Sequence, residues 1–170
     1  YSNERFTDKL NLFNARDDKI SNSWPWKTLY ENNRCLIPCS SYYEWTKSSM
    51  FGKSSTPFMI QMKDKTPFYL AGLYTTTIDA FNKNPTASCA IITTDANSLQ
   101  STIHKRMPVI IPVQNVSTWL NKDIQRYSHI EGLLKPYPSN FMEMWPVSNK
   151  LGNVKNNYFE LTKPISKLLL

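Results

Sequence analysis

The stretch Pro67-Phe68-Tyr69-Leu70-Ala71-Gly72-Leu73-Tyr74-Thr75-Thr76 is rich in the aromatic and β-branched residues that strands favour. It therefore predicts a β-strand. Gly72 lies inside it, and a glycine within a strand indicates a bulge or a close approach of another part of the chain.

Further strands are predicted on both sides of this stretch. They have alternating or continuous apolar character and lie at Arg34–Trp45, Pro57–Met62, Ser88–Thr94 and Val109–Val113. Short helices are predicted at Trp24–Glu31, Gln114–Leu120 and Ile130–Leu134. Ser21 or Ser23 is expected to cap the first of them. The pattern indicates the α+β class, with a mostly antiparallel, curved, barrel-like sheet and short helices at its rims.

Length and composition limit the class of protein. A chain of 170 residues with 41% hydrophobic and 19% charged residues is typical of one folded domain, and we expect a single domain over residues 1–170. No apolar run approaches the roughly 18 residues that a membrane span needs. We expect a monomer without a membrane partner.

The net charge of +7 favours a polyanionic partner, with nucleic acid ahead of a membrane surface. Many basic proteins bind neither, so charge alone leaves this open. The basic residues are scattered along the chain, which indicates a folded basic surface rather than a basic tail.

The three cysteines, Cys35, Cys39 and Cys89, form an odd number without a C-x-x-C pair. This argues against a disulfide framework and against a zinc site. All three lie in apolar runs, where buried, inert thiols are expected. An internal Cys–His nucleophile remains an alternative. With only two histidines, we expect no metal and no organic cofactor. The thiols also fit a reducing cytosol.

His104 and Glu44 are the first candidates for proton transfer. His104 follows a polar loop and precedes Lys105 and Arg106, so a surface histidine without a role is the alternative. Glu44 lies between Tyr43 and Trp45, where a paired structural acid is equally plausible.

Binding candidates are more scattered. Asn14 and Arg16 follow an apolar pair, and the amide and guanidinium could hold a carbonyl and a phosphate. The alternative is a turn asparagine with a solvated arginine. Further phosphate contacts and base-stacking surfaces could come from Lys105, Arg106, Lys155, Trp24, Trp26, Trp45 and Trp145.

Four strings in this order and approximate spacing resemble the SOS response-associated peptidase (SRAP) family. They are Asn14-Ala15-Arg16, Tyr42-Tyr43-Glu44-Trp45, Ile103-His104-Lys105-Arg106-Met107-Pro108, and Trp145-Pro146-Val147-Ser148 with Gly152-Asn153-Val154-Lys155-Asn156. The resemblance covers roughly residues 12–157.

The resemblance implies a protein that binds single-stranded DNA and crosslinks itself to abasic sites. An amino-terminal cysteine would form a thiazolidine with the opened sugar. By similarity, Asn14 would hold that cysteine, Glu44 would move protons, and His104 would assist ring opening and reversal. Thr93 would line the pocket, and Arg16 and Arg106 would grip phosphates.

The family's motif Met-Cys-Gly-Arg is not in this sequence, where only 13 residues precede Asn14. We therefore expect that an amino-terminal segment carrying the nucleophile lies outside the sequence shown. Two alternatives stay open: a peptidase with an amino-terminal cysteine, and a non-catalytic single-strand binder. The resemblance also implies a bacterial cytoplasmic protein that associates with the nucleoid when it binds DNA.

Overall fold

A computed structural model describes residues 13–46, 55–78 and 83–165. These residues form two compact units. The first unit comprises residues 13–38, 69–78, 83–94 and 108–136, and the second comprises residues 39–46, 55–68, 95–107 and 137–165.

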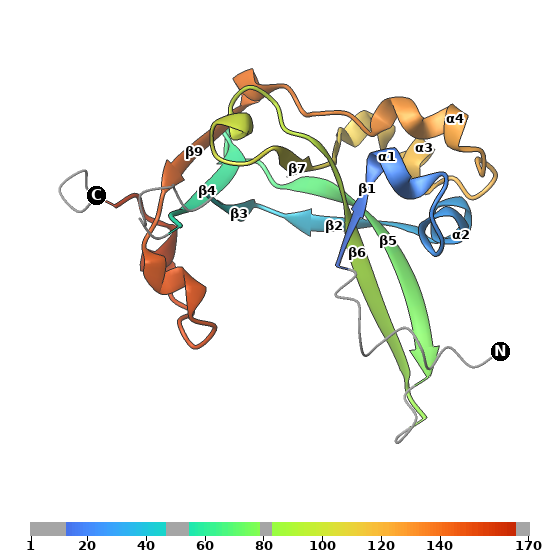
Figure 1. The fold of residues 1–170 in the computed structure, drawn as a ribbon, viewed down its shortest axis with the longest axis horizontal. Coiled ribbons are helices and arrows are strands. Elements are labelled where there is room, and N and C mark those ends of the chain that lie inside the picture. Colours follow the sequence, from blue (N-terminus) through green and yellow to red (C-terminus); the bar gives the residue numbers. More distant parts are fainter. Residues whose placement is uncertain (1–12, 47–54, 79–82, 166–170) are drawn as a thin grey trace. The chain divides into compact units, whose positions relative to one another are not determined.

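The first unit is built on a curved, open sheet (Figure 1). Its strands are β1 (Asn14–Arg16), β2 (Arg34–Cys39), β5 (Phe68–Ile78), β6 (Pro85–Asp95) and β8 (Ile110–Ile111). They follow the order β1-β6-β5-β2, and β8 pairs with β5. β5 runs antiparallel to β6 and to β8, whereas β1 runs parallel to β6.

Short helices gather around one end of this sheet (Figure 1). They are α1 (Asp17–Ile20), α2 (Trp26–Asn32), α3 (Val116–Leu120) and α4 (Tyr127–Ile130), with 3-10 turns η2 (Val113–Asn115) and η3 (Glu131–Leu133). Helices and sheet share one buried apolar core, formed by Ala15, Ile20, Tyr30, Ala71, Leu73, Ile92, Val109, Ile111, Trp119, Ile130 and Leu134. Burial of this core supplies the main drive for folding of the unit.

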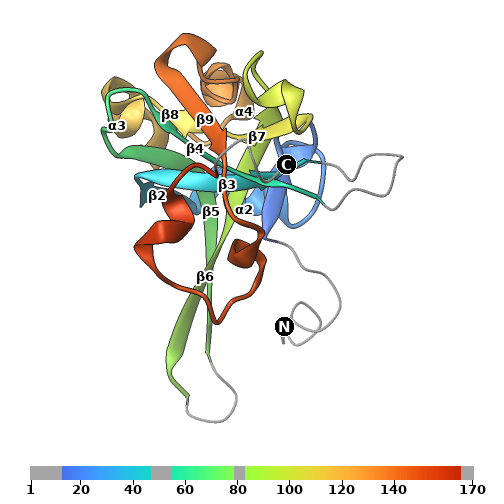
Figure 2. The ribbon, with the colours of Figure 1, turned by 90° about the vertical axis from the view of Figure 1, so that its left-hand side faces the viewer.

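The far ends of β5 and β6 extend beyond the helices as a two-stranded ribbon (Figures 1 and 2). On β6 every side chain from Pro85 to Cys89 is exposed. The prediction that all three cysteines are buried is therefore wrong for Cys89. Its apolar neighbours belong to a strand that is held at this point by pairing with β5, not by burial.

Gly72 lies at a close approach between strands, as predicted. A Cβ atom at this position would lie 2.8 Å from Cys35 Sγ and 3.1 Å from Ile37 Cδ1. Only a residue without a side chain leaves room for both neighbours.

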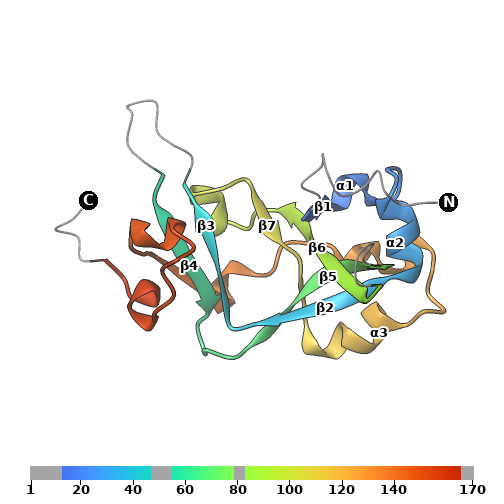
Figure 3. The same cartoon turned by 90° about the horizontal axis from the view of Figure 1, so that it is seen from below.

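The second unit is built on an antiparallel sheet in the order β3-β4-β9. The elements of the unit are β3 (Ser41–Trp45), β4 (Pro57–Met62), β7 (Arg106–Pro108) and β9 (Met142–Pro146), with the 3-10 turns η1 (Gln100–Thr102), η4 (Ser139–Phe141), η5 (Asn149–Gly152) and η6 (Phe159–Thr162). Figure 3 shows β3 alongside β4. The buried apolar residues of the second unit include Ile60, Met107, Met142 and Val147.

The α+β class, the curved sheet and the short helices are confirmed. The prediction that Ser21 or Ser23 caps the first predicted helix is wrong, because Pro25 occupies the N-cap of α2 and makes no side-chain hydrogen bond there. The run Val109–Val113 contains only a two-residue strand, and Val113 is 76% exposed. Pro112 follows β8 and has no N–H with which to continue a ladder. Within the described residues, no helix has both the length and the apolar character needed to cross a membrane.

Candidate functional site

In the first unit, β1 carries Asn14 and Arg16 on one face and Ala15 on the other. Ala15 is fully buried in the core, whereas both polar neighbours are exposed. This follows from the two-residue period of a strand. Register places Arg16 beside Thr93 and Asn14 beside Ile91. The structure therefore brings Asn14, Arg16 and Thr93 together on one face of two neighbouring strands.

The guanidinium of Arg16 is held by a local carboxylate. Its Nε and a terminal nitrogen donate to the two oxygens of Asp18 at 2.9 and 2.8 Å. This forked contact pre-orients the arginine plane. Because the side chain is still 52% exposed, it can reach an anion from this position. Asp18 lies only two residues away in the sequence, so its acidic character was a signal that could have identified it.

In the second unit, Glu44 and His104 lie together. Glu44 Oε2 is 3.7 Å from His104 Nδ1, and the two side chains are 25% and 32% exposed. The other carboxylate oxygen, Oε1, accepts a hydrogen bond from the Trp45 backbone N–H at 3.0 Å. Strand β3 supplies Glu44 and is fixed by its antiparallel pairing with β4, in which Glu44 lies opposite Phe58.

The loop after β6 supplies His104. Its backbone N–H donates to the Gln100 carbonyl at 2.9 Å. Nδ1 of the ring lies 3.0 Å from the Arg106 carbonyl oxygen and 3.2 Å from the Arg106 N–H. Nδ1 donates to the first when it carries the proton and accepts from the second when it does not. Main-chain atoms of Arg106 therefore constrain the orientation of the imidazole ring.

Arg106 also lies in the second unit, with a side chain that is only 16% exposed. Its guanidinium donates to Asp95 at 2.9 Å. Asp95 is 86% exposed, so this ion pair lies at the surface. Neither its position nor its pairing was predicted from the sequence.

Two residues without a predicted role connect β3 to the His104 loop. Gln100 is 1% exposed and accepts a hydrogen bond from the Tyr42 hydroxyl at 2.5 Å. Its amide nitrogen donates to the Arg106 carbonyl at 2.8 Å. A lone glutamine in a polar loop carries no local signal of such a role.

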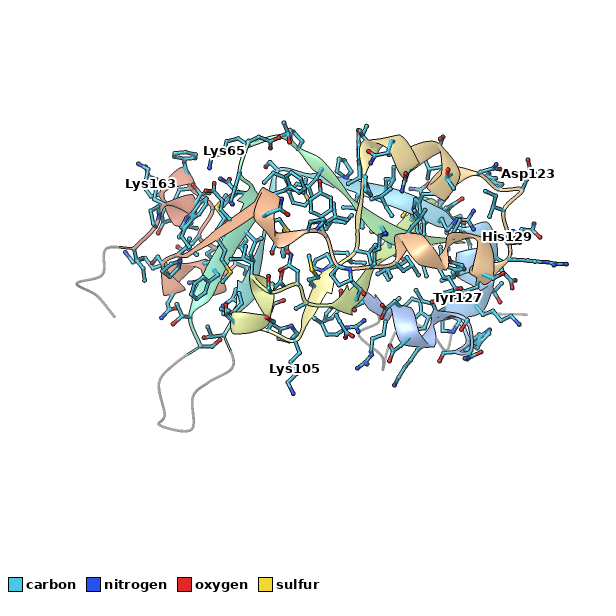
Figure 4. All side chains as sticks on the ribbon, turned by 90° about the horizontal axis from the view of Figure 1, so that it is seen from above. Lys65, Lys105, Asp123, Tyr127, His129 and Lys163 are labelled. Carbon is cyan, nitrogen blue, oxygen red and sulfur yellow. The ribbon has the colours of Figure 1, made fainter. Side chains whose placement is uncertain are left out.

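Of the other predicted stacking residues, Trp24 is 74% exposed and Trp45 is 39% exposed. Trp26 is partly buried and packs against the core of the first unit, and Trp145 is partly buried and donates from its indole nitrogen to the Thr162 carbonyl at 2.9 Å, so the structure does not support these two as exposed stacking surfaces. Lys155 is exposed in the irregular segment after η5. Lys105, next to His104, points away from the ribbon into solvent (Figure 4).

The internal thiols fit poorly with a nucleophilic role. Burial raises the pKa of Cys35 and of Cys39 to about 11, so very little of either is thiolate near neutral pH. Among the described residues, no group of three or more His, Cys, Asp or Glu side chains could hold a metal ion. What the second unit offers is a carboxylate and an imidazole 3.7 Å apart and both partly exposed, which is an arrangement suited to proton transfer.

Comparison with known proteins connects this geometry to a family. Residues 1–154 match the model of the SOS response associated peptidase (SRAP) family. The chain is 36% identical over 153 residues to the abasic site processing protein YoqW of Bacillus subtilis, covering 88% of this chain and 66% of that relative. It is 28% identical to the abasic site processing protein YedK of Escherichia coli, covering 93% of this chain and 69% of that relative.

The fold is similar to that of a solved protein from Bacteroides thetaiotaomicron, with a TM-score of 0.79 and 29% identity over 90% of this chain and 66% of that one. The chain spans about 66% of the length of the Bacillus relative. The family predicted from the four strings is confirmed: this chain belongs to the SOS response associated peptidase (SRAP) family.

Proposed function

We propose that this protein processes abasic sites, binding single-stranded DNA and forming a covalent crosslink to the opened sugar. The observation that carries the proposal is the pairing of Glu44 with His104 at 3.7 Å in a chain of this family. Relatives with 36% and 28% identity are named as abasic site processing proteins. The net charge of +7 supports a polyanionic partner.

The nucleophile in this proposal is an amino-terminal cysteine in a segment outside these 170 residues. Its neutral α-amine adds to C1′ of the aldehyde form of the sugar, and loss of one water gives an imine. The thiol sulfur then adds to the imine carbon while its proton moves to the nitrogen, which closes a thiazolidine. Overall, two bonds to C1′ form and one water leaves, without any oxidant.

Glu44 and His104 are the proton-transfer groups of this scheme. Glu44 takes and returns the protons that move during amine addition and loss of water. His104 assists opening of the sugar ring and the reverse reaction. Both side chains are partly exposed, so a sugar can reach them from solvent.

Further residues have proposed binding roles. Asn14 would hold the terminal cysteine, and Thr93 would line the pocket. Arg16 and Arg106 would contact the phosphates that flank the lesion, with orientations already restrained by Asp18 and Asp95. Trp45 and Lys155 would add a stacking surface and a further phosphate contact.

The test is a denaturing gel of the full-length protein, with its native start, incubated with single-stranded DNA that carries one abasic site. A heat-stable shifted band that requires the lesion is expected. Glu44→Gln and His104→Asn should slow its formation by about a hundredfold to ten-thousandfold. The control is His129→Asn, which changes an exposed histidine of the first unit.

The absence of a band with the wild-type full-length protein would overturn the proposal. Salt-sensitive binding of intact single strands in that case would identify a non-catalytic binder. Hydrolysis of peptides without any DNA adduct would instead identify a peptidase.

A further inference from the structure

A partly buried chain of hydrogen bonds, centred on the buried Gln100, lies beside the Glu44–His104 pair. The Tyr42 hydroxyl donates to Gln100 Oε1 at 2.5 Å, and Gln100 Nε2 donates to the Arg106 carbonyl at 2.8 Å. That same carbonyl oxygen lies 3.0 Å from His104 Nδ1. The chain therefore runs from strand β3 through one side-chain amide to the atom that faces the imidazole.

Gln100 is fixed by its backbone as well as by its side chain. Its N–H donates to Asn97 Oδ1 at 2.9 Å, and its carbonyl accepts from the N–H groups of Ile103 and His104, each at 2.9 Å. A side chain that is 1% exposed and held in this way has little freedom to turn. Its position is thus transmitted to the loop that carries His104.

The direction of each bond follows from the chemistry of the partners. The Arg106 carbonyl can only accept, so the nitrogen of the Gln100 amide must face it. The amide oxygen therefore faces Tyr42, whose hydroxyl must donate. Burial, with Glu44 and Cys39 as further contributors, raises the pKa of Tyr42 well above its usual value. The hydroxyl consequently keeps the proton that it donates.

Strand period places this chain next to the candidate site. Tyr42 and Glu44 are two residues apart on β3, so they share a face of the strand. The His104 loop contacts that face twice, through Tyr42–Gln100 and through Glu44–His104. The first contact is a short, partly buried hydrogen bond, and the second spans 3.7 Å, beyond hydrogen-bond length. The first can therefore set the geometry of the second.

We propose that Tyr42 and Gln100 are positioning residues, which hold the Arg106 carbonyl where it orients the His104 imidazole toward Glu44. The effect of these two residues on the reaction rests on the proposed function, whereas their effect on the orientation of the His104 imidazole does not. The orientation of the imidazole can therefore be measured without DNA.

The experiment records the imidazole ¹⁵N resonances of the full-length protein at one fixed pH, assigned with His104→Asn and His129→Asn. Tyr42→Phe and Gln100→Leu are compared with wild type. Tyr127→Phe is the matched control, because its hydroxyl also makes a hydrogen bond, to the Asp17 carbonyl at 3.3 Å, but in the first unit.

We expect both test variants to change the tautomer balance of His104 and to leave the resonances of His129 unchanged. Tyr127→Phe should leave His104 unchanged. The crosslinking rate should fall by about tenfold to a hundredfold in the test variants. If Gln100→Leu does not fold, Tyr42→Phe carries the test, since it keeps the ring that packs against Phe68 at a centroid distance of 6.2 Å.

Unchanged His104 resonances in folded Tyr42→Phe would overturn the proposal, because the pair would then serve packing alone. Altered resonances in a protein whose wild type forms no crosslink would support the positioning and overturn the proposed function. A changed tautomer balance of His104 with an undiminished crosslinking rate would show that Tyr42 and Gln100 orient the ring without affecting the reaction, and would overturn their role in it.

Discussion

Replacing Arg34 by methionine removes a buried guanidinium that links two helix ends in the first unit. The guanidinium donates to the main-chain oxygens of Tyr30, Trp119 and Asn121 at 2.7, 2.7 and 2.5 Å. Its carbon also lies 5.7 Å from the ring centroids of Tyr30 and Trp119. These oxygens belong to the carboxyl-terminal ends of α2 and α3, where carbonyls lack partners within the helix. Methionine keeps much of the apolar stem but donates no hydrogen bond.

The magnitude follows from three charge-assisted hydrogen bonds. Each contributes about 1.5–3 kcal/mol, so together they contribute about 5–9 kcal/mol before other costs. Burial of the charge costs several kcal/mol and lowers the pKa of Arg34. The expected net loss in the free energy of unfolding is about 3–5 kcal/mol, since three carbonyls are left without their donor. Arg34→Lys keeps the charge but loses the planar fork, so we expect it to recover only part of this loss.

Urea unfolding followed by circular dichroism measures the change. The control is Arg126→Met, which removes an exposed arginine of the same unit and should change stability by less than about 0.5 kcal/mol. A loss of less than about 1 kcal/mol for Arg34→Met would refute the reasoning, because that is the worth of an exposed ion pair. Full recovery by Arg34→Lys would show that charge alone, and not the fork, is required.

Three further predictions concern single side chains. Gly72→Ala should lower the free energy of unfolding by about 1–3 kcal/mol, because the new methyl group overpacks against Cys35. Adding Cys35→Ala to this variant should restore part of the loss. An equal loss with and without the Cys35 side chain would show that this contact is not the cause. With a thiol-reactive dye at pH 8, the exposed Cys89 should react fast, whereas Cys35 and Cys39, with pKa values of about 11, should react slowly. The rates of the two slow thiols should rise about tenfold for each unit of increase in pH. Cys89→Ser should remove the fast phase, and a fast phase that persists in this variant would refute the assignment. Hydrogen bonds from Lys65 and Gln61 lower the pKa of Glu143, so the carboxylate stabilises the fold above its unfolded-state pKa, and this contribution is lost as pH falls through the folded-state pKa. The free energies of unfolding of wild type and Glu143→Gln, measured with urea, should therefore converge at acidic pH. A difference between them that grows toward acidic pH would contradict this sign.

Local patterns predicted some strands closely but missed one strand boundary. Arg34–Trp45 was predicted as one strand, whereas the structure divides it into β2 and β3, which belong to different sheets. Pro57–Met62 was predicted with the bounds that the structure shows, and Pro67–Thr76 differs by one residue at its start and two at its end. Both stretches combine strand-forming residues with a proline at or near the start, so neighbouring residues contain the necessary information. By contrast, β6 extends to Pro85 through exposed residues, because pairing with β5 and not burial holds that part.

The candidate site was predicted in part. The motif strings identified Glu44 and His104, and the structure places them 3.7 Å apart. No pattern identified Gln100 or Tyr42 as a link between them, although both lie within or near the quoted strings. The proposed roles of Asn14 and Thr93 stay predictions; the structure adds only that they share a face of β1 and β6.

Family, strand positions and the types of residue at the site are determined by the sequence alone, because each depends on residue identities within short stretches. Tertiary structure alone decided which distant groups meet. Tyr42 contacts Gln100 across 58 residues of chain, and Arg34 contacts Trp119 across 85. Such hydrogen bonds require atoms to lie within about 3 Å of one another in a defined orientation. That precision arises only when packing of the core and pairing of the strands have placed the two segments side by side.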